Sequence, residues 1–354
     1  MSARPEIARP EIARPESARP ERIGARGMAA ASLVLVSVVT GLAGGTPSAH
    51  AASTLDGAKK ATQSTSYSGD LAYRWSDSGG VHETTVRVSV DHGVVRADGG
   101  VGVETDPRGT YVRRGERWDL VWPGPGGGFT LAPPDAGAKY TERSADGPTV
   151  AGRPTREVTL AVGAVPRFRL DLDRATGVLL RQVSLDAGGA TRREVAFSQI
   201  TFGAGTSSQS AGPQGLVEAD RDQVPVAMSV DGLPSPYVAP SDAGAGFHKI
   251  GVYRRPAAVQ ILYSDGVARL SIFEQAGAID ARIPVGAAAG IRSTWQGGTG
   301  VEFRRGGVLF TVVGDVDPAE LLEVADHLGD PPSESVGQRL RGASRRLVEA
   351  LTGA

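Results

Sequence analysis

The stretch Tyr67–Trp75, YSGDLAYRW, indicates the fold class because two kinds of side chain alternate along it. One set consists of Tyr67, Gly69, Leu71, Tyr73 and Trp75, and the other of Ser68, Asp70, Ala72 and Arg74. Successive side chains of a β-strand point to opposite faces, so a period of two predicts a strand with one buried face. The same pattern recurs at Thr84–Val90, after a turn at Ser78–Gly80.

Further along the chain, a group of long strands is predicted at Arg153–Val162, Pro166–Asp173, Val178–Leu185 and Thr191–Phe202. Their connections are short and rich in glycine, which favours antiparallel neighbours. A short helix is predicted before the first strand, at Leu55–Ser64. Residues 52–202 are therefore expected to form a curved antiparallel β-module.

A second module is expected at residues 246–330, after a linker at residues 203–245 that is rich in Gly, Ser, Pro and Ala. Strand patterns recur through this module, and a tight turn is expected at Ser264–Gly266. Pro318 suits the first turn of a helix running to His327. The fold class is thus mainly β, with a smaller α+β antiparallel-sheet module after the curved half-barrel.

The first 51 residues are read as a leader. The unit Ala-Arg-Pro-Glu recurs through the first 22 residues, which is typical of low complexity or of a start codon placed too far upstream. An apolar run at Met28–Ala43 and the small residues Ala49-His50-Ala51 then predict a signal peptide cleaved after Ala51, with an uncleaved membrane anchor as the alternative. The protein is therefore expected to be exported.

The last residues, 331–354, predict a basic amphipathic helix. Val336, Leu340, Leu347 and Leu351 form its apolar stripe, and four arginines surround them. Such a helix either docks on its own module or meets anionic lipid or an acidic partner, and both interpretations remain open.

Composition excludes several classes of function. The chain has 354 residues and no cysteine, which excludes disulfides, thiolate metal sites and a cysteine nucleophile. Its net charge of −1 does not suit a nucleic-acid binder. The five histidines lack metal-ligand spacing, and nucleophile-elbow and phosphate-loop motifs are missing. We therefore expect neither an enzyme nor a resident cofactor.

Two local patterns could each indicate a functional site or a simple structural feature. Asp171 and Asp173 share one face of a strand and could form a carboxylate pair, but we expect a solvated strand end before the turn at Arg174–Gly177. The glycine-rich stretch Gly124–Gly128 lacks the strand and helix of a phosphate cradle, so we interpret it as the mobile rim of the sheet.

A group of aromatic residues gathers in the first module: Tyr73, Trp75, Tyr111, Trp118, Trp122 and Phe129. Each of them fits an ordinary packed core. As a group, they could instead line a concavity that takes a lipid, because such cavities are mostly apolar and aromatic.

The order of several short motifs resembles the MucB/RseB family of sigma-factor regulatory proteins, in the form found in high-GC Gram-positive bacteria. In the first module these are Tyr67-Ser68-Gly69, the run 150–154 (VAGRP) and the run 172–181 (LDRATGVLLR). In the second they are Gly246-Phe247, Tyr253-Arg254-Arg255, Leu262–Gly266, the run 270–273 (LSIF) and Gly314-Asp315. The resemblance extends from Tyr67 to Leu328.

This resemblance implies a LolA-like half-open barrel followed by an α+β domain that binds a membrane-anchored anti-sigma factor. It implies an exported, non-enzymatic protein that shields its partner from regulated proteolysis and releases it on binding a lipid. The aromatic group would then line the ligand concavity. The partner-binding residues would be the exposed turn Tyr263, Ser264, Asp265 and Gly266 together with Arg254, Arg255, Arg304 and Arg305. The alternative is an extracytoplasmic carrier of lipid or lipoprotein that uses the same curved sheet.

The leader gives a first testable prediction. Signal peptidase should cut before Ala52, because the small residues Ala49 and Ala51 precede that bond. N-terminal sequencing of the exported protein should read Ala-Ser-Thr-Leu from residue 52. A protein whose first residue lies upstream of Met28 would contradict the assignment.

Overall fold

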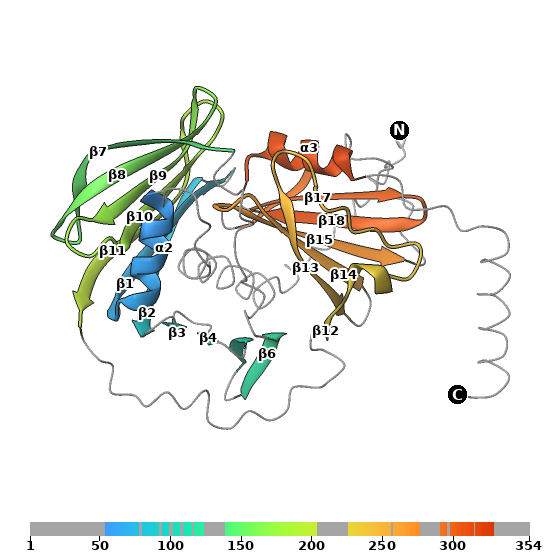
Figure 1. Cartoon of the computed structure of the whole chain (residues 1–354), viewed down its shortest axis with the longest axis horizontal. Helices are drawn as coiled ribbons and strands as arrows, with labels where there is room; N and C mark the ends of the chain where they lie inside the picture. The colour runs from blue at the N-terminus through green and yellow to red at the C-terminus, as the bar shows by residue number, and fades with distance from the viewer. Residues whose placement is uncertain are drawn as a thin grey trace, which may run out of the picture.

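The computed structural model describes residues 54–77, 80–91, 94–98, 102–106, 109–114, 117–123, 139–203, 226–255, 258–276, 291–295, 298–314 and 316–328. Two antiparallel sheets dominate it, as Figure 1 shows. The mainly β fold class is thereby confirmed, with a broad curved sheet followed by a smaller sheet that carries a helix. Within the described residues, no helix is long and apolar enough to cross a membrane.

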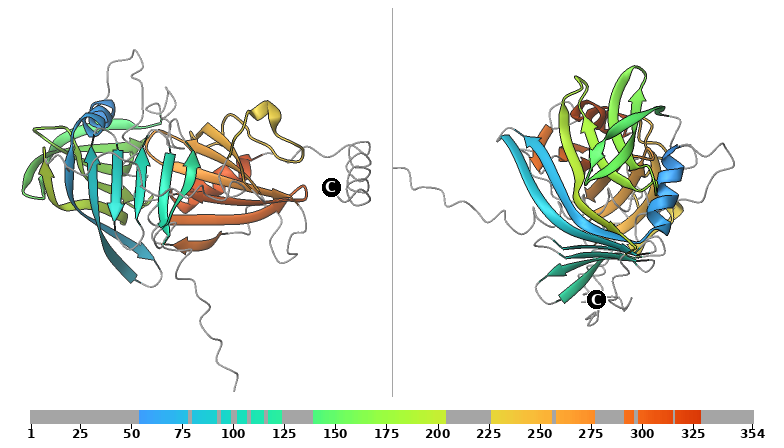
Figure 2. Two further views of the ribbon diagram at one scale, coloured as in Figure 1. Left: turned by 90° about the horizontal axis from the view of Figure 1, so that it is seen from below. Right: turned by 90° about the vertical axis from the view of Figure 1, so that its left-hand side faces the viewer.

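The first sheet has eleven strands in the order β6-β5-β4-β3-β2-β1-β11-β10-β9-β8-β7. The strands are β1 Tyr67–Asp77, β2 Gly80–Asp91, β3 Val94–Asp98, β4 Val103–Asp106, β5 Gly109–Arg114, β6 Arg117–Pro123, β7 Thr141–Val150, β8 Arg153–Val162, β9 Val165–Asp173, β10 Leu179–Leu185 and β11 Thr191–Phe202. The two halves of this meander meet where β1 pairs with β11, so that Tyr67 lies opposite Phe202. Figure 2 shows the strong curvature of the sheet.

Helix α2 (Thr54–Ser64) packs on the inner side of this sheet. Leu55 and Ala58 join the apolar cluster of β8 and β9, and Ala61 contacts the cluster formed by β1, β2 and β11. Gly177 lies under Ala61 with a positive φ of 76°, where a side chain would be strained. The helix therefore fills part of the concave side instead of leaving it open.

The outer face of the same sheet carries a ladder of alternating charges across five strands. Asp171 pairs with Arg181 (2.9 Å), which also pairs with Glu194 (2.6 Å). Glu194 lies 3.6 Å from Arg74, which pairs with Glu83 at 2.8 Å. Opposite charges on neighbouring strands stabilise the pairing register and keep this face polar.

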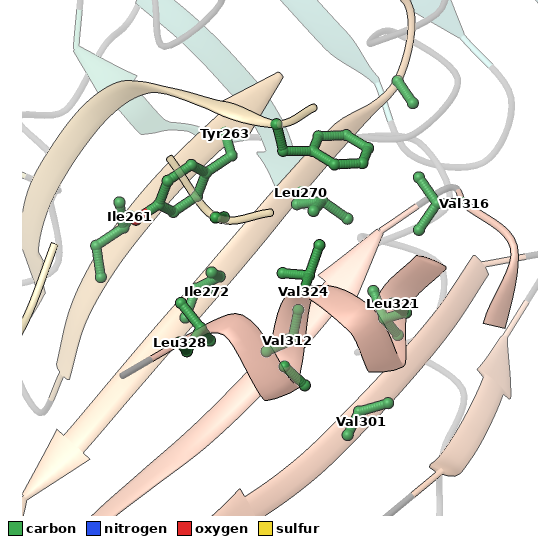
Figure 3. Packing of buried hydrophobic residues seen from close by; sticks show 14 of the residues in the cluster. Ile261, Tyr263, Leu270, Ile272, Val301, Val312, Val316, Leu321, Val324 and Leu328 are labelled. Carbon is green, nitrogen blue, oxygen red and sulfur yellow. The ribbon is translucent and has the colours of Figure 1, made fainter. Parts of the chain in front are cut away.

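The second sheet has seven strands in the order β12-β13-β14-β15-β18-β17-β16. The elements are β12 Val226–Ala227, the 3-10 helix η2 Val230–Gly232, β13 His248–Arg255, β14 Ala258–Ser264, β15 Arg269–Ala276, β16 Ile291–Trp295, β17 Gly298–Arg305, β18 Val308–Gly314 and α3 Pro318–His327. Figure 3 shows α3 packed on one face of this sheet through Leu321, Val324 and Leu328. The Asp317 side chain accepts a hydrogen bond from the Ala319 amide, which caps the helix one residue before Pro318.

The expected linker differs from the structure in its second half. Residues 228–245, here called the strap, lie on the second sheet, and β12 extends that sheet before them. The Val238 amide donates to Glu274 (2.8 Å), the Tyr263 hydroxyl donates to the Pro240 carbonyl (2.9 Å), and Lys249 donates to the Ala239 carbonyl (2.6 Å). The second module therefore begins by Val226, because the strap supplies its backbone groups to side chains of the sheet.

Glu274 gives a prediction about pH. Its side chain is fully buried, and this burial raises its pKa from 4.5 to about 8. The folded state holds the proton more tightly than the unfolded state, so its stabilising effect is complete below pH 4.5 and is lost as the pH rises to about 8. Glu274→Gln keeps an acceptor for the Val238 amide without this titration.

Urea unfolding at pH 5, 6.5 and 8 should therefore show the variant gaining stability over the native chain as pH rises. One pKa unit corresponds to about 1.4 kcal/mol, so the difference should be easy to measure. Parallel profiles for the two proteins would contradict the assignment of a buried, protonated Glu274.

Candidate functional site

The two modules contact one another through a buried polar cluster, here called the seam. It consists of Lys139, Tyr140 and Arg167 from the first module and Asp265, Asp317 and Glu320 from the second. All its cations come from the first module and all its carboxylates from the second. Apolar side chains of both modules, including Phe168, Leu170, Phe247 and Leu270, belong to one continuous core cluster around it.

Asp265 makes the central contacts of the seam. One carboxylate oxygen accepts from Lys139 Nζ (2.8 Å) and from the Tyr140 hydroxyl (2.5 Å). The other accepts from the amides of Val267 (3.0 Å) and Ala268 (2.8 Å), which closes the turn. Burial and the adjacent Asp265 carboxylate raise the pKa of the Tyr140 hydroxyl, which therefore stays a donor.

Asp317 forms a second cross-module contact. Besides capping α3, it accepts from Arg167 (3.3 Å) and from the Ala187 amide (3.1 Å) of the first module. Lys139 also reaches Glu320 (3.0 Å) on α3. The start of α3 is therefore fixed to the first sheet as well as to its own sheet.

The expected exposed turn at Tyr263–Gly266 is wrong. Tyr263, Ser264 and Asp265 are at most 4% exposed, and Gly266 is buried as well. A Ser-Asp-Gly turn usually lies on the surface, but here the first module covers it through Lys139 and Tyr140. Asp265 holds the modules together, while Tyr263, Ser264 and Gly266 make their hydrogen bonds within the second module.

The four arginines assigned to partner binding separate onto two faces of the second sheet. Residues paired across antiparallel strands share a face. Arg254 pairs with Val259 and Arg305 with Val308, both in the core beneath α3. Arg255 pairs with Ala258 and Arg304 with Leu309, on the opposite face. Arg305 also donates to the Leu328 carbonyl and thereby anchors the end of α3.

The aromatic group of the first module does not form one lining. Tyr73 and Trp75 lie together with ring centroids 5.2 Å apart, and His82 stacks on Trp75 at 5.1 Å. Tyr111 instead lies opposite Glu104 on the neighbouring strand. Across the next strands, Glu104 lies opposite Arg96, Arg96 opposite Ser89, and Ser89 opposite Ser68, so all of these side chains are on the other face of the sheet. The expectation of a single aromatic concavity is therefore wrong for Tyr111, because the strand register reverses its face.

The side chains of three other members of that group lie outside the described residues. Trp118 and Trp122 occupy β6, in register with Arg113 and Thr110, and their side chains lie outside the described residues. Phe129, the Gly124–Gly128 stretch, the leader and the predicted C-terminal helix also lie outside them.

The inner face of the first sheet holds one charge that the sequence reasoning overlooked. Arg193 is 1% exposed, donates to the Ser184 hydroxyl (3.4 Å) and is hydrogen-bonded to Tyr73. Burial lowers the pKa of its guanidinium. The sequence does carry a signal for this residue. Arg193, Val195 and Phe197 are each two residues apart along β11, so their side chains lie on the same face.

Asp171 and Asp173 share a face as predicted, but they are not a solvated strand end. Both are at most 2% exposed. Burial raises the pKa of Asp171, and Arg181 only partly offsets this effect. Burial also disfavours the ionised Asp173, but Arg153 and Thr176 together hold its pKa below the usual value. Their buried partners indicate a structural role.

A cavity of about 460 Å³ lies beside these aspartates, where β7 meets the turn after β9. Its lining is mostly polar and charged, and consists of Ser144, Ala145, Asp146, Arg156, Asp173, Arg174 and Gly177. This lining differs from the apolar wall that a lipid chain requires. Among the described residues, no group of three histidine, aspartate or glutamate side chains could hold a metal ion.

Comparison with known proteins gives structural neighbours only. No protein-family model and no curated protein match the chain. It is similar to MucB in complex with MucA(peri), with 25% identity over 77% of this chain and 96% of that one and a TM-score of 0.49. The MucA/MucB complex of Pseudomonas aeruginosa gives 24% identity, 77% and 95% coverage and a TM-score of 0.47. Lipoprotein LppX of Mycobacterium tuberculosis gives 11% identity, 40% and 90% coverage and a TM-score of 0.26.

The seam gives a prediction about stability. Asp265→Ala removes the partner of Lys139 and Tyr140 and the cap of its own turn, and should destabilise the chain by roughly 3–5 kcal/mol, as expected when one member of a buried pair is lost. Glu83→Gln is the matched control, because it breaks an ion pair whose members are each about half exposed.

Chemical denaturation should show a large loss of stability for the first variant and little change for the second. Equal effects from both would mean that the seam is no more important than a surface ion pair.

Proposed function

We propose that this chain is an exported regulatory protein that binds the extracytoplasmic part of a membrane-anchored anti-sigma factor and modulates its proteolysis. The ordered motifs shared with the MucB/RseB family support this proposal across both modules. So do the absence of catalytic motifs from the sequence and the predicted leader. Two of the neighbouring solved structures are complexes of MucB with MucA.

One structural observation carries the proposal: the two faces of the second sheet differ in what they contain. The strap, α3 and the first module all pack on the face that contains Ile261, Tyr263 and Leu270. The other face contains Tyr253, which is 8% exposed, together with Arg255 and Phe273, which are half-buried. Tyrosine, arginine and other aromatic residues are enriched where proteins bind one another.

A lipid signal is the second part of the proposal. The first module would respond to it near Tyr73 and Trp75, where Trp75 is only half-buried at one end of the apolar inner face. A contact between the C-terminal segment and the membrane surface would keep the protein near its partner. A carrier of lipid or lipoprotein remains the competing function. It requires that the packed side chains of the inner face move apart to admit an acyl chain.

Binding experiments distinguish these functions. The extracytoplasmic segments of the single-span anti-sigma factors of the source organism should be purified and tested one by one against the exported chain. We expect calorimetry to show saturable binding of one segment. The protease that cuts this segment should also cut it more slowly when the chain is present.

The carrier function makes the opposite prediction. A carrier would remove fluorescent phospholipid from vesicles and transfer it to acceptor vesicles without any anti-sigma segment. Lipid transfer combined with no binding to any segment would overturn the proposed function.

A further inference from the structure

The strand β7 is an exposed edge of the first sheet. Among the described strands it pairs with β8 alone, and Figure 1 shows it at the margin of the first module. Every residue from Thr141 to Asp146 is exposed, although all six lie in a regular ladder with β8. The backbone groups on the other side of β7 therefore have no described strand to pair with, which makes this edge a template for a further strand.

The features that usually block such an edge are confined to one end of β7. Pro148 and the register shift beside it interrupt only the last part of the strand. The stretch Thr141–Asp146 contains no proline or lysine and is about 20 Å long. The edge of β13 is different, because the strap covers it and the Lys249 amide donates to the Ser241 carbonyl. Thr141–Asp146 is thus long enough and regular enough to pair with another chain.

The two sides of this stretch present different groups. Ser144, Asp146 and Arg156 line the polar cavity of about 460 Å³, and Asp146 lies opposite Arg156 in the ladder. Arg143 lies on the other side of the sheet, opposite Thr159. A strand added to β7 would therefore place alternate side chains beside the cavity and beside Arg143.

Two arginines are available to such a strand. Arg143 and Arg156 are exposed, and neither side chain forms an ion pair or a hydrogen bond in the part of the chain that the structure describes. A guanidinium group binds a carboxylate through two parallel hydrogen bonds. A partner strand with acidic residues on both of its faces would therefore meet one arginine on each side.

The carboxylates near the edge are already engaged, since each accepts a hydrogen bond within the first module. The donors are Arg174 for Asp146, Arg153 for Asp173, the first amide of α2 for Glu142 and Thr159 for Glu157. The two arginines have no such contact, so the edge favours an acidic segment over a basic one.

We propose that an extended, acidic segment of the anti-sigma partner adds to this edge as a further strand, next to Thr141–Asp146. One acidic side chain of the segment would pair with Arg143. Another, an odd number of residues away, would pair with Arg156 at the cavity, because successive side chains of a strand point to opposite faces. Backbone hydrogen bonds supply affinity in this mode of binding, and the side-chain pairs supply selectivity. This inference rests on the proposed function and names a surface on the first module for its partner.

A second copy of the chain suits this edge less well. A two-fold axis between two antiparallel β7 strands places one residue opposite its own copy. Pairing centred on Arg143 opposes two arginines, and pairing centred on Ser144 opposes Glu142 and Asp146, so both bring like charges together. Pairing centred on Ala145 extends into the irregular end of the strand.

Two exposed arginines provide a matched test in the full chain. Arg143→Glu reverses a charge at the edge. Arg169→Glu makes the same change on the same side of the sheet but two strands further in, because both arginines lie opposite Thr159. Arg169 is also exposed and has no described ion pair. The probe is whichever anti-sigma segment binds the native chain, and calorimetry at 50 mM and 500 mM NaCl is the measurement.

Arg143→Glu should weaken binding at least tenfold at low salt and reduce its salt dependence, whereas Arg169→Glu should change it less than threefold. Arg156→Gln removes the charge at the cavity and should weaken binding by a smaller factor. Replacing the acidic residue of the segment that faces Arg143 with lysine should restore binding to Arg143→Glu, because the pair of charges is exchanged. Thermal unfolding checks that each variant is folded.

Hydrogen exchange tests the backbone contact in the native chain. Alternate amides of Thr141–Asp146 point away from β8, and they should exchange more slowly when the segment is bound. The amides of β10, which lies inside the same sheet, should show no change and serve as the reference.

The outcomes separate the two levels of the proposal. If a segment binds without slowing exchange in β7, or binds Arg143→Glu as tightly as the native chain, the edge is the wrong surface while the proposed function stands. If Arg169→Glu weakens binding as much as Arg143→Glu, the segment lies on the face of the sheet and the inference fails. If the native chain alone sediments as a dimer that Arg143→Glu dissociates, a second copy occupies the edge and the inference also fails. If no segment binds the native chain, the proposed function is overturned and this inference falls with it.

Discussion

The arrangement of the whole molecule depends on one buried carboxylate, that of Asp265. Its two oxygens satisfy the amides of its own turn and, across the seam, the ammonium group of Lys139 and the hydroxyl of Tyr140. A carboxylate that is 1% exposed is costly to bury unless such partners surround it. The turn can therefore adopt its native environment only when the first module is docked, which couples the folding of one sheet to the position of the other.

This coupling also determines how one face of the second sheet is used. The seam, α3 and the strap occupy the same face of that sheet. The seam also separates charges by module, with cations on one side and carboxylates on the other, as at an interface between two proteins. The residues of the seam are thus committed to holding the modules together.

Sequence patterns were most informative where one face of an element is buried and the other exposed. The alternation in Tyr67–Trp75 predicted β1, and Pro318 predicted the start of α3. The strands β4, β7 and β16 were missed. β7 has the sequence TERSADGPTV and lies at the edge of its sheet with almost every side chain exposed, so it carries no apolar alternation. Its Gly147 is instead required because a Cβ there would come within 2.2 Å of the Thr155 hydroxyl.

The sequence by itself determined the mainly β class, the antiparallel hairpins and the site of α3, because these depend on periodicity and turn residues that are local in the chain. Only the tertiary structure decided that β1 closes against β11, that Asp265 is buried by Lys139, and that Arg254, and not Arg255, lies on the face toward α3. Asp265 and Lys139 are 126 residues apart, and no local pattern encodes such a contact. The same holds for the two faces of a strand. Which face belongs to the core and which to the surface is decided only when another element packs on one of them.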